Sequence, residues 1–421
     1  MYRAGMMTAL VFLLLSTACS KENSEEIGYS FMTTVEDGTE TAVTRGGPRY
    51  RGELFLYEEA LLLQEDPANE ESLLNRPGMI TADERGYFYV IDSGDACIAV
   101  FDPAGRFLRR IGRSGQGPGE FSRLSNLQVH NGIIHVYDAQ LNRTTRFRTG
   151  GTLLDMTTVP GGVIDRRQGI VRDMHILDDG TMLLTQSLMS EDDLGQFSQM
   201  RVLALSTAHD TLWSIDTPVM QTSQTTTLPS GGMLSFSMPF SGMAVIHIHP
   251  IHGIIVSDGL EPELLWYGTT GRLTRKVRIE LEPVPLTGED LAKTRARFQK
   301  QIEDARESGQ TMMAEFYEAE LKAMKMPDCR PFWRQVVVSD RGYLWLQIVE
   351  HSADREAAGG GYLYRVLSPA GEYLGDTRVP YGLRFTLTGD RLLCTWTPPD
   401  TDEYQLLVGR IVPLIEGLEY P

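Results

Sequence analysis

The stretch "MITADERGYFYVIDSGDACIAVFDPAGRFLRRI", Met79 to Ile111, decides the fold. Short runs of alternating apolar residues are separated by the turn signals "DERG", "SGDA" and "DPAGR". This pattern is typical of four short strands joined by tight turns. The stretch therefore predicts one four-stranded antiparallel sheet.

The pattern returns in "NLQVHNGIIHVYDAQLNRTTRFRTGGTLLDMTTV", Asn126 to Val159. Leu127 takes the place of Ile80, so the repeat period is 47 residues. Less regular copies follow at 172–215, 244–279, 334–379 and 383–412. A four-stranded sheet buries both faces only by stacking on neighbours, so we expect an all-β, six-bladed propeller of four-stranded antiparallel blades.

The sixth copy ends without a fourth strand, while an unassigned strand, "GELFLYEEALLL", lies at Gly52 to Leu63. Pairing this strand beside Leu406 to Ile411 completes the sixth sheet and removes two exposed sheet edges. We therefore expect the N-terminal strand to close the last blade, with the propeller spanning 52–421.

The chain resembles six-bladed propellers of the NHL-repeat type found among bacterial lipoproteins, a largely uncharacterised group. "GYFYVIDSGDACIAVFDPAGRFL", "GIIHVYDAQLNRTTRFRTGGTLL" and "GRSGQGPGEF" carry this resemblance, which covers about 52–412. It implies the fold and leaves the activity open, because one fold hosts many functions.

The connector "IGRSGQGPGEF", Ile111 to Phe121, superficially resembles a phosphate-binding loop. Such a loop needs a following helix, and a Walker loop needs Gly-Lys-Ser/Thr. Here Pro118 interrupts the glycines and a strand follows. The stretch is interpreted as the passage from the outer strand of blade one to the inner strand of blade two.

The N-terminus is predicted to be a lipoprotein signal peptide, residues 1–18. Arg3 precedes the apolar run "ALVFLLL", and "LSTACS" resembles a lipobox whose acylated residue is Cys19. The alternative is an ordinary secretory signal cut after Ala18. Both routes export the chain. The resemblance to Gram-negative lipoproteins implies that Ser20, rather than Asp, after the cysteine favours the outer membrane of a bacterial cell envelope. The polar, acidic residues 19–51 are predicted to be a flexible tether.

The formal net charge of −17 argues against nucleic acid and against docking on an anionic membrane surface. Cys97, Cys329 and Cys394 show no metal-ligand spacing, and their pairing is left open. We expect no cofactor.

Residues 287–327 are predicted to form a helical hairpin inserted between blades four and five. Thr287 and Asp290 form a capping-box pattern, Gly309 separates two helical periods and Pro327 ends the second. The hairpin either covers the channel mouth, binds a partner, or caps a blade edge.

Recurring polar residues have competing interpretations. Asp92, Asp138 and Asp258 recur at one repeat position, which favours turn capping over calcium binding. His247 and His249 alternate on one strand near His252, where a structural role is favoured over a metal site.

Arg172 and Arg334 each precede their repeat's turn glycine by eight residues, and Arg384 enters the sixth copy at a comparable place. These arginines are predicted to lie at the channel mouth, where they either bind an anionic ligand or pair with acidic loops. No catalytic residues are assigned, because neither a general-acid set nor a Ser-His-Asp order is visible.

Two functions remain. The favoured one is a lipid-anchored binding module for an envelope protein, peptide or glycan. The alternative is a divergent propeller hydrolase or lyase with an axial metal- or arginine-lined site.

Overall fold

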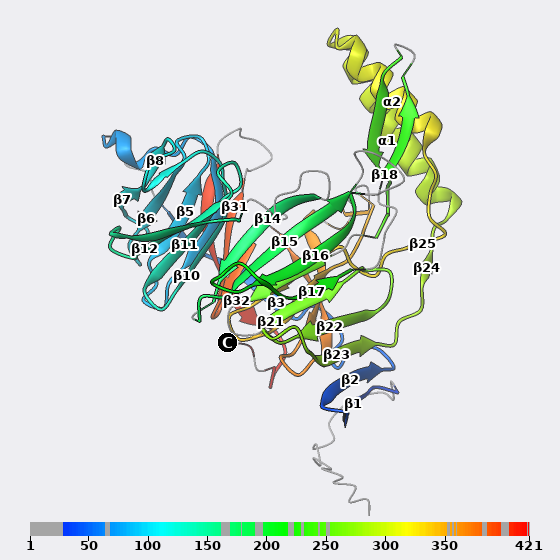
Figure 1. Cartoon of the computed structure of the whole chain (residues 1–421). Coiled ribbons are helices and arrows are strands. Elements are labelled where there is room, and N and C mark those ends of the chain that lie inside the picture. The colour runs from blue at the N-terminus through cyan, green and yellow to red at the C-terminus, as the bar shows by residue number, and fades with distance from the viewer. Residues whose placement is uncertain are drawn as a thin grey trace, which may run out of the picture.

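The computed structural model describes residues 28–63, 68–160, 169–177, 179–189, 197–217, 223–228, 231–242, 245–249, 253–351, 354–355, 358, 360–380, 385–396, 404–418 and 420. Within these residues six antiparallel sheets are arranged in a ring, so the predicted six-bladed β-propeller is confirmed (Figure 1). The predicted signal peptide and Cys19 lie outside the described residues.

The blades follow one another along the chain, and each is named by its strands. Blade one contains β4 (Pro77–Ala82), β5 (Phe88–Asp92), β6 (Cys97–Phe101) and β7 (Phe107–Ile111). Blade two contains β10 (Leu124–His130), β11 (Ile133–Asp138), β12 (Arg143–Arg148) and β13 (Leu153–Thr158). Blade three contains β14 (Gly169–Ile176), β15 (Met182–Met189), β16 (Phe197–Leu205) and β17 (Thr211–Asp216).

The second half of the ring continues this order. Blade four contains β20 (Val245–His249), β21 (Gly253–Ser257), β22 (Glu263–Tyr267) and β23 (Leu273–Ile279). Blade five contains β26 (Gln335–Val338), β27 (Leu344–Gln347), β28 (Tyr362–Leu367) and β29 (Tyr373–Val379). Blade six contains β30 (Phe385–Thr388), β31 (Arg391–Trp396), β32 (Gln405–Pro413) and β3 (Phe55–Leu62).

The predicted closure of the sixth blade is confirmed. β3 pairs antiparallel with β32, with Leu56 opposite Val412. Phe55 is almost fully buried and stacks on Trp345 of blade five, with ring centroids 5.4 Å apart. The two ends of the propeller therefore share one sheet.

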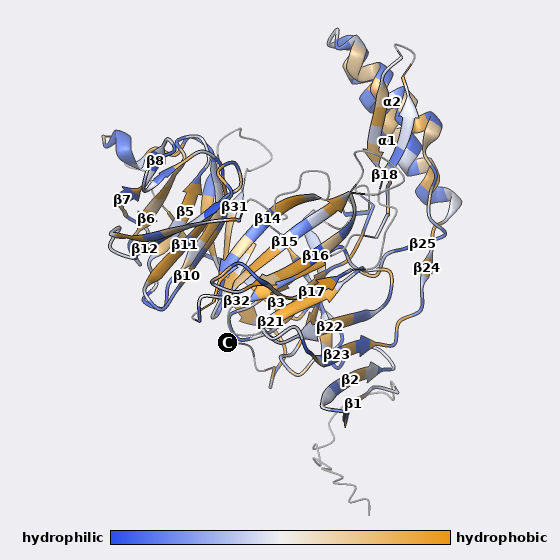
Figure 2. Cartoon of the chain, viewed as in Figure 1, coloured by the Kyte–Doolittle hydropathy of each residue, from blue (hydrophilic) through white to orange (hydrophobic). Residues whose placement is uncertain are grey.

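An apolar cluster fills each interface between neighbouring blades. Tyr89, Leu127 and Ile134 belong to the cluster between blades one and two, while Phe88 and Leu393 belong to the cluster between blades one and six. All five residues of β5 are buried, because both faces of this strand pack on other blades. The hydrophobic colouring of the blade strands in Figure 2 follows from this two-sided burial.

The expected flexible tether is wrong for its second half. β1 (Ser30–Glu36) and β2 (Thr39–Arg45) form a hairpin, and β2 pairs parallel with β23, extending the sheet of blade four to six strands. Ala42 and Thr44 of β2 are fully buried, and the Thr44 hydroxyl accepts the Tyr373 N–H at 3.0 Å. This burial against blade five is what orders the segment, and the ordered body begins before the expected boundary at Gly52.

The insertion between blades four and five is a helical hairpin, as predicted. α1 (Gly288–Glu307) and α2 (Thr311–Ala323) rise from a short strand pair, β24 (Val284–Pro285) with β25 (Cys329–Arg330). A second hairpin, which the sequence pattern did not indicate, comes from the preceding connection: β18 (Ser223–Thr227) and β19 (Met233–Ser237). Figure 1 shows α1, α2 and β18 projecting together from the ring. These four elements, α1, α2, β18 and β19, are called the arm.

The arm has an apolar core of its own. Ile302, Ala305 and Ala314 are buried between the two helices, and Phe298 meets Tyr317 edge-on at 6.5 Å. The predicted capping box is present at the start of α1. No helix in the described part of the chain is long and apolar enough to cross a bilayer.

The glycine connector between blades one and two closes on itself. β8 (Arg113–Ser114) pairs with β9 (Glu120–Phe121), and the buried Arg143 of blade two donates to the carbonyl oxygens of Gln116 and Gly117 at 2.9 Å each and to that of Glu120. A phosphate-binding loop presents N–H groups to its ligand. Here carbonyl groups face a cation, which agrees with the connector interpretation.

Candidate functional site

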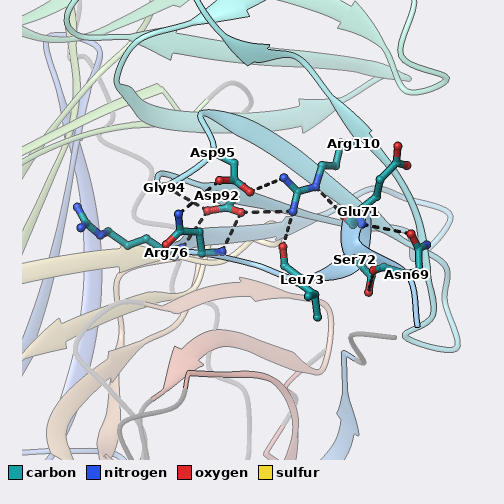
Figure 3. Close-up of polar contacts among 10 residues, drawn as sticks. Asn69, Glu71, Ser72, Leu73, Arg76, Asp92, Gly94, Asp95 and Arg110 are labelled. Atoms are coloured by element: carbon teal, nitrogen blue, oxygen red, sulfur yellow. Dashed lines mark hydrogen bonds and ion pairs between the residues drawn. The ribbon is translucent and has the colours of Figure 1, made fainter. Parts of the chain in front are cut away.

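The repeated aspartates join each blade to the chain that enters it. The fully buried Asp92 carboxylate accepts N–H bonds from Asn75 at 3.1 Å, Arg76 at 2.9 Å and Gly94 at 3.1 Å (Figure 3). Two of these donors lie just before β4 and one lies in the turn after β5. Asp92 therefore ties a connection to a turn on the same face of the ring, which supports the turn-capping interpretation.

Arg110 of β7 completes this network in Figure 3. Its guanidinium donates to Asp95 at 2.5 Å, to the Glu71 carbonyl at 2.6 Å and to the Leu73 carbonyl. The hydrogen bond from Arg110 lowers the pKa of Asp95. These contacts hold the short helix η1 (Glu70–Ser72) against blade one.

Asp138 and Asp258 repeat the role of Asp92 in part. Asp138 accepts the N–H groups of Ser122 at 2.6 Å and Gln140 at 2.9 Å, so it too spans a connection and a turn. Asp258 accepts the N–H groups that follow it in its own turn, from Leu260 at 2.9 Å. Turn capping is confirmed for all three aspartates.

Arg172 and Arg334, two of the arginines predicted to lie at the channel mouth, have similar hydrogen-bond partners. Arg172 lies at a bulge in β14 and donates through Nε to Ser187 of β15 at 2.9 Å. Arg334 directly precedes β26 and donates through Nε to Gln347 of β27 at 2.9 Å. Arg172 thus lies in the middle of the inner strand β14, whereas Arg334 lies at the start of the inner strand β26. Arg384 lies outside the described residues.

A pocket of about 410 Å³ lies where the arm meets blades four and five. Its walls come from the connection after β19, from α1, and from the ends of β26 and β27. The lining residues are Ser237, Met238, Pro239, Phe240, Ser241, Gly242, Thr294, Arg297, Arg334, Val349, Glu350 and His351. Connections between blades and turns between second and third strands lie on one face of an antiparallel propeller. The pocket is therefore on the connector face, and it contains Arg334 but not Arg172.

The pocket wall carries two guanidinium groups and one carboxylate. Arg378 holds Glu350 through two hydrogen bonds, at 2.7 and 3.0 Å. Arg297 is exposed on α1, beside the ring of Phe298 at 5.0 Å. Neither Arg297 nor Arg334 forms an ion pair with a carboxylate of the described residues. The local charge is therefore positive in a chain whose formal net charge is −17.

Phe240 and His351 form the aromatic part of the wall. Their ring centroids are 6.3 Å apart, and the Arg330 guanidinium lies 5.4 Å from the Phe240 ring. Burial lowers the pKa of His351, so its imidazole adds no positive charge at neutral pH. Phe240 has φ of 55°, a left-handed conformation that is rare for a residue other than glycine.

Charged contacts hold the base of α1 over this pocket. Lys293 binds Asp354, in the loop after β27, at 2.5 Å and Glu289 at 2.9 Å. Asp290 is buried and accepts from Arg330 of β25. Both contacts place Thr294 and Arg297, one turn further along α1, at the pocket wall.

Six of the eight histidines fall into two groups. His247 and His249 lie on one face of β20 with ring centroids 6.3 Å apart, while His252 lies outside the described residues. His130 and His135 of blade two stack at 4.6 Å, and His175 of blade three binds Asp173 at 2.8 Å. Within the described ranges no three His, Cys, Asp or Glu side chains are placed to hold a metal ion. Cys97, Cys329 and Cys394 are separate thiols.

The sequence did not single out most of this pocket. Thr294 and Arg297 were part of a predicted helix, and Phe240 and Glu350 belonged to no motif. Three segments far apart in the chain form the wall. Only the topological rule that all blade connections share one face pointed to this region.

Comparisons with known proteins agree on the fold. The model of the DUF5128 family, described as a 6-bladed beta-propeller, matches residues 68–165, which contain blades one and two. No curated protein matches the chain.

Solved structures align with most of the chain. A member of the DUF4221 family from Bacteroides vulgatus is 12% identical, with a TM-score of 0.52 over 86% of this chain and 99% of that one. A putative exported protein from Bacteroides fragilis is 13% identical, with a TM-score of 0.47 over 85% and 95%. Virginiamycin B lyase from Staphylococcus aureus is 11% identical, with a TM-score of 0.39 over 86% and 100%. The likeness to the DUF4221 protein, at 12% identity, concerns the fold alone.

Proposed function

We propose that the protein is a lipid-anchored, extracytoplasmic binding module that holds an envelope protein, peptide or glycan on the connector face of its propeller. The observation that carries this proposal is the pocket of about 410 Å³ beneath the arm. Its volume lies within the range of small-molecule and side-chain binding sites, about 300–1,000 Å³. Of the two predicted ligand-binding arginines within the described ranges, Arg334 lines it.

The proposed location rests on the N-terminal sequence. The apolar run "ALVFLLL" and the lipobox-like "LSTACS" support export and acylation of Cys19. Replacing Cys19 with Ser in cells is expected to move the protein from the outer-membrane fraction to the soluble periplasmic fraction. An unchanged membrane fraction would count against the anchor.

The arrangement supports binding rather than turnover. Hydrolysis of a glycoside uses two carboxyl groups, one on each side of the reacting bond. Glu350 is the only carboxylate among the described lining residues, and Arg378 engages both of its oxygens. No observation in the described residues favours the hydrolase or lyase alternative.

Blocking the pocket tests the proposal. Ser237 is exposed at the rim, so Ser237→Trp is expected to fill the mouth without disturbing the blades. Ser235→Trp is the matched control, because Ser235 is exposed on the same strand and does not line the pocket. Immobilised full-length protein is incubated with fractionated envelope peptides and glycans, and retained components are measured by mass spectrometry.

The proposal expects retention by the wild type and by Ser235→Trp, and its loss in Ser237→Trp. If Ser237→Trp retains the same components in the same amounts as Ser235→Trp, the binding surface lies outside this pocket. Retention of nothing by the wild type would overturn the binding function.

A further inference from the structure

We propose that the ligand group held in this pocket is an acidic sugar that carries a single carboxylate, of the hexuronate kind. This inference rests on the proposed function, because it names the ligand class of the same pocket. Its elements are the charge of the wall, its hydroxyl groups, its size and its attachment to α1.

The positive charge of the pocket wall favours an anionic ligand. Arg297 and Arg334 line the pocket without an ion pair to a described carboxylate, while Glu350 is compensated by Arg378. The charge of Arg297 reaches Glu320 only at longer range, where it opposes the rise that burial causes in the pKa of that carboxyl group. Nε of Arg334 is engaged by Gln347, which fixes the plane of the guanidinium group and leaves its terminal nitrogens for a ligand. A planar guanidinium binds a carboxylate through two parallel hydrogen bonds.

The same wall disfavours a highly charged anion. Glu350 lies in the lining together with the two arginines. Even with Arg378 bound to it, the Glu350 carboxylate would repel a nearby phosphate dianion more strongly than a singly charged carboxylate, since like charges at an interface are costly. One negative charge on the ligand is therefore the better match.

The remaining polar groups suit a polyhydroxylated ligand. Ser237, Ser241 and Thr294 contribute hydroxyl groups, which both donate and accept hydrogen bonds. The Glu350 oxygens each keep acceptor capacity beside their bonds to Arg378. A sugar offers hydroxyl groups to both kinds of partner, whereas the terminal residue of a peptide offers amides.

Size agrees with one sugar residue. About 410 Å³ holds roughly a dozen waters, each with a share of about 30 Å³, or one monosaccharide with some bridging water. The pocket therefore fits a terminal acidic sugar better than a folded protein surface.

The arm supplies one of the two cations. Arg297 belongs to α1, and Lys293 and Asp290 hold the base of this helix on the ring. Anion binding is therefore expected to depend on an inserted element that the regular repeat does not contain.

Titration calorimetry with the full-length protein in detergent tests the inference. The probes are D-glucuronate, neutral D-glucose, inorganic phosphate and the dipeptide acetyl-glycyl-alanine, which has a free carboxylate. We expect the dissociation constant for glucuronate to be at least about tenfold lower than that for each of the other probes. A factor of this size is what one charge-assisted hydrogen bond contributes.

Three variants show which residues bind glucuronate. Arg297→Ala and Arg334→Lys are each expected to weaken glucuronate binding about tenfold, the second because lysine keeps the charge and loses the planar fork. Arg295→Ala, exposed on the same helix and outside the pocket lining, is expected to remain within about twofold of the wild type. Circular dichroism confirms that each variant is folded.

Absence of glucuronate binding, equal binding of glucose, or tighter binding of phosphate or the dipeptide each overturns the acidic-sugar inference. Unchanged affinity in both Arg297→Ala and Arg334→Lys overturns it as well. If another probe binds and Ser237→Trp abolishes that binding, the proposed function stands and only the ligand class is wrong. If Ser237→Trp has no effect on any probe, both fail.

Discussion

The connection between blades one and two and the connection between blades four and five make the same step, from an outer strand to the next inner strand. The first, residues 112–123, folds back on itself, and Arg143 and Glu120 satisfy its polar groups. The second, residues 280–334, leaves the ring, forms α1 and α2, and returns through Arg330 and Arg334. The same type of blade connection is thus closed by its own hydrogen bonds in one place, called the sealed link below, and forms a pocket wall in another, called the open link.

The difference shows where a propeller can acquire a binding site. In the sealed link the backbone groups of the glycine turn are used inside the protein: the Gly117 N–H donates to Glu120, and the carbonyl groups of Gln116 and Gly117 accept from Arg143. At the open link the inserted helices bring Arg297 beside Arg334, and no described carboxylate pairs with either. Substitutions in the sealed link should therefore act on folding, and those at the open link should act on binding and local motion.

The largest expected effect comes from breaking the seal at Gly112. Its φ is +81°, and an added Cβ would lie 2.3 Å from Cε2 of Phe121, a fully buried core residue. Gly112→Ala is therefore expected to cost about 3–4 kcal/mol of unfolding free energy, from backbone strain and overpacking together. Urea unfolding followed by tryptophan fluorescence measures the loss.

Gly132→Ala separates the two causes. Gly132 has φ of +72°, but an added Cβ would meet nothing within 4 Å. Gly132→Ala is therefore expected to lose only the part of the unfolding free energy that comes from backbone strain, about 1 kcal/mol. Equal losses in both variants would show that the close contact with Phe121 does not matter and that the connector is less tightly sealed than its geometry indicates.

A smaller effect is expected from pH at the interface of blades two and three. Burial, together with the neighbouring His130, lowers the pKa of His135 to about 4, and Arg146 and His175 act in the same direction while Asp155 opposes them. The unfolded value is about 6.5. The folded state therefore binds fewer protons between these values, and stability is lost as the pH falls from about 6.5 to about 4.

Unfolding free energies at pH 7.5 and pH 5.0 measure this loss. After allowance for solvent screening, His135 is expected to contribute about 1–2 kcal/mol of the decrease. His135→Gln should remove that share, whereas His209→Asn, at an exposed turn, should not. An unchanged pH dependence in His135→Gln would mean that the imidazole is charged or solvated at pH 5.

The sequence was sufficient to predict the ring because the fold depends on a repeated pattern. Met79 to Ile111 and Asn126 to Val159 each encode a blade locally, and the missing strand of the sixth copy indicated how the ring closes. The N-terminal hairpin was missed, although Asp37-Gly38 is a strong hairpin signal and both residues have positive φ. The polar residues around this dipeptide favour a flexible tether, and that composition was given more weight than the hairpin signal.

The pocket was harder to predict for a physical reason. Arg334 was found because it occupies a repeat position, and position in a blade places it near the axis. Arg297 and Phe240 reach the same pocket from two insertions that follow no repeat. Sequence periodicity carries no information on how insertions from neighbouring connections pack together, so their meeting appears only in three dimensions.

The smallest expected effect on stability is at the joint of the arm. Lys293 links α1 to Asp354 on the body, and water still reaches both side chains, which are 28% and 39% exposed, so the ion pair adds little to global stability. Lys293→Ala is therefore expected to leave the unfolding midpoint within about 1–2 °C of the wild type. Because the apolar core of Phe298, Ile302 and Ala314 is untouched, the helices should stay folded while the base of α1 exchanges amide hydrogen faster. Lys300→Ala, exposed on the same helix, is the control. If amide hydrogens exchange faster in both variants, the loss of a lysine from α1 is the cause, and the ion pair with Asp354 is not. If they exchange faster in Lys293→Ala alone, this ion pair is the joint about which the open connection moves.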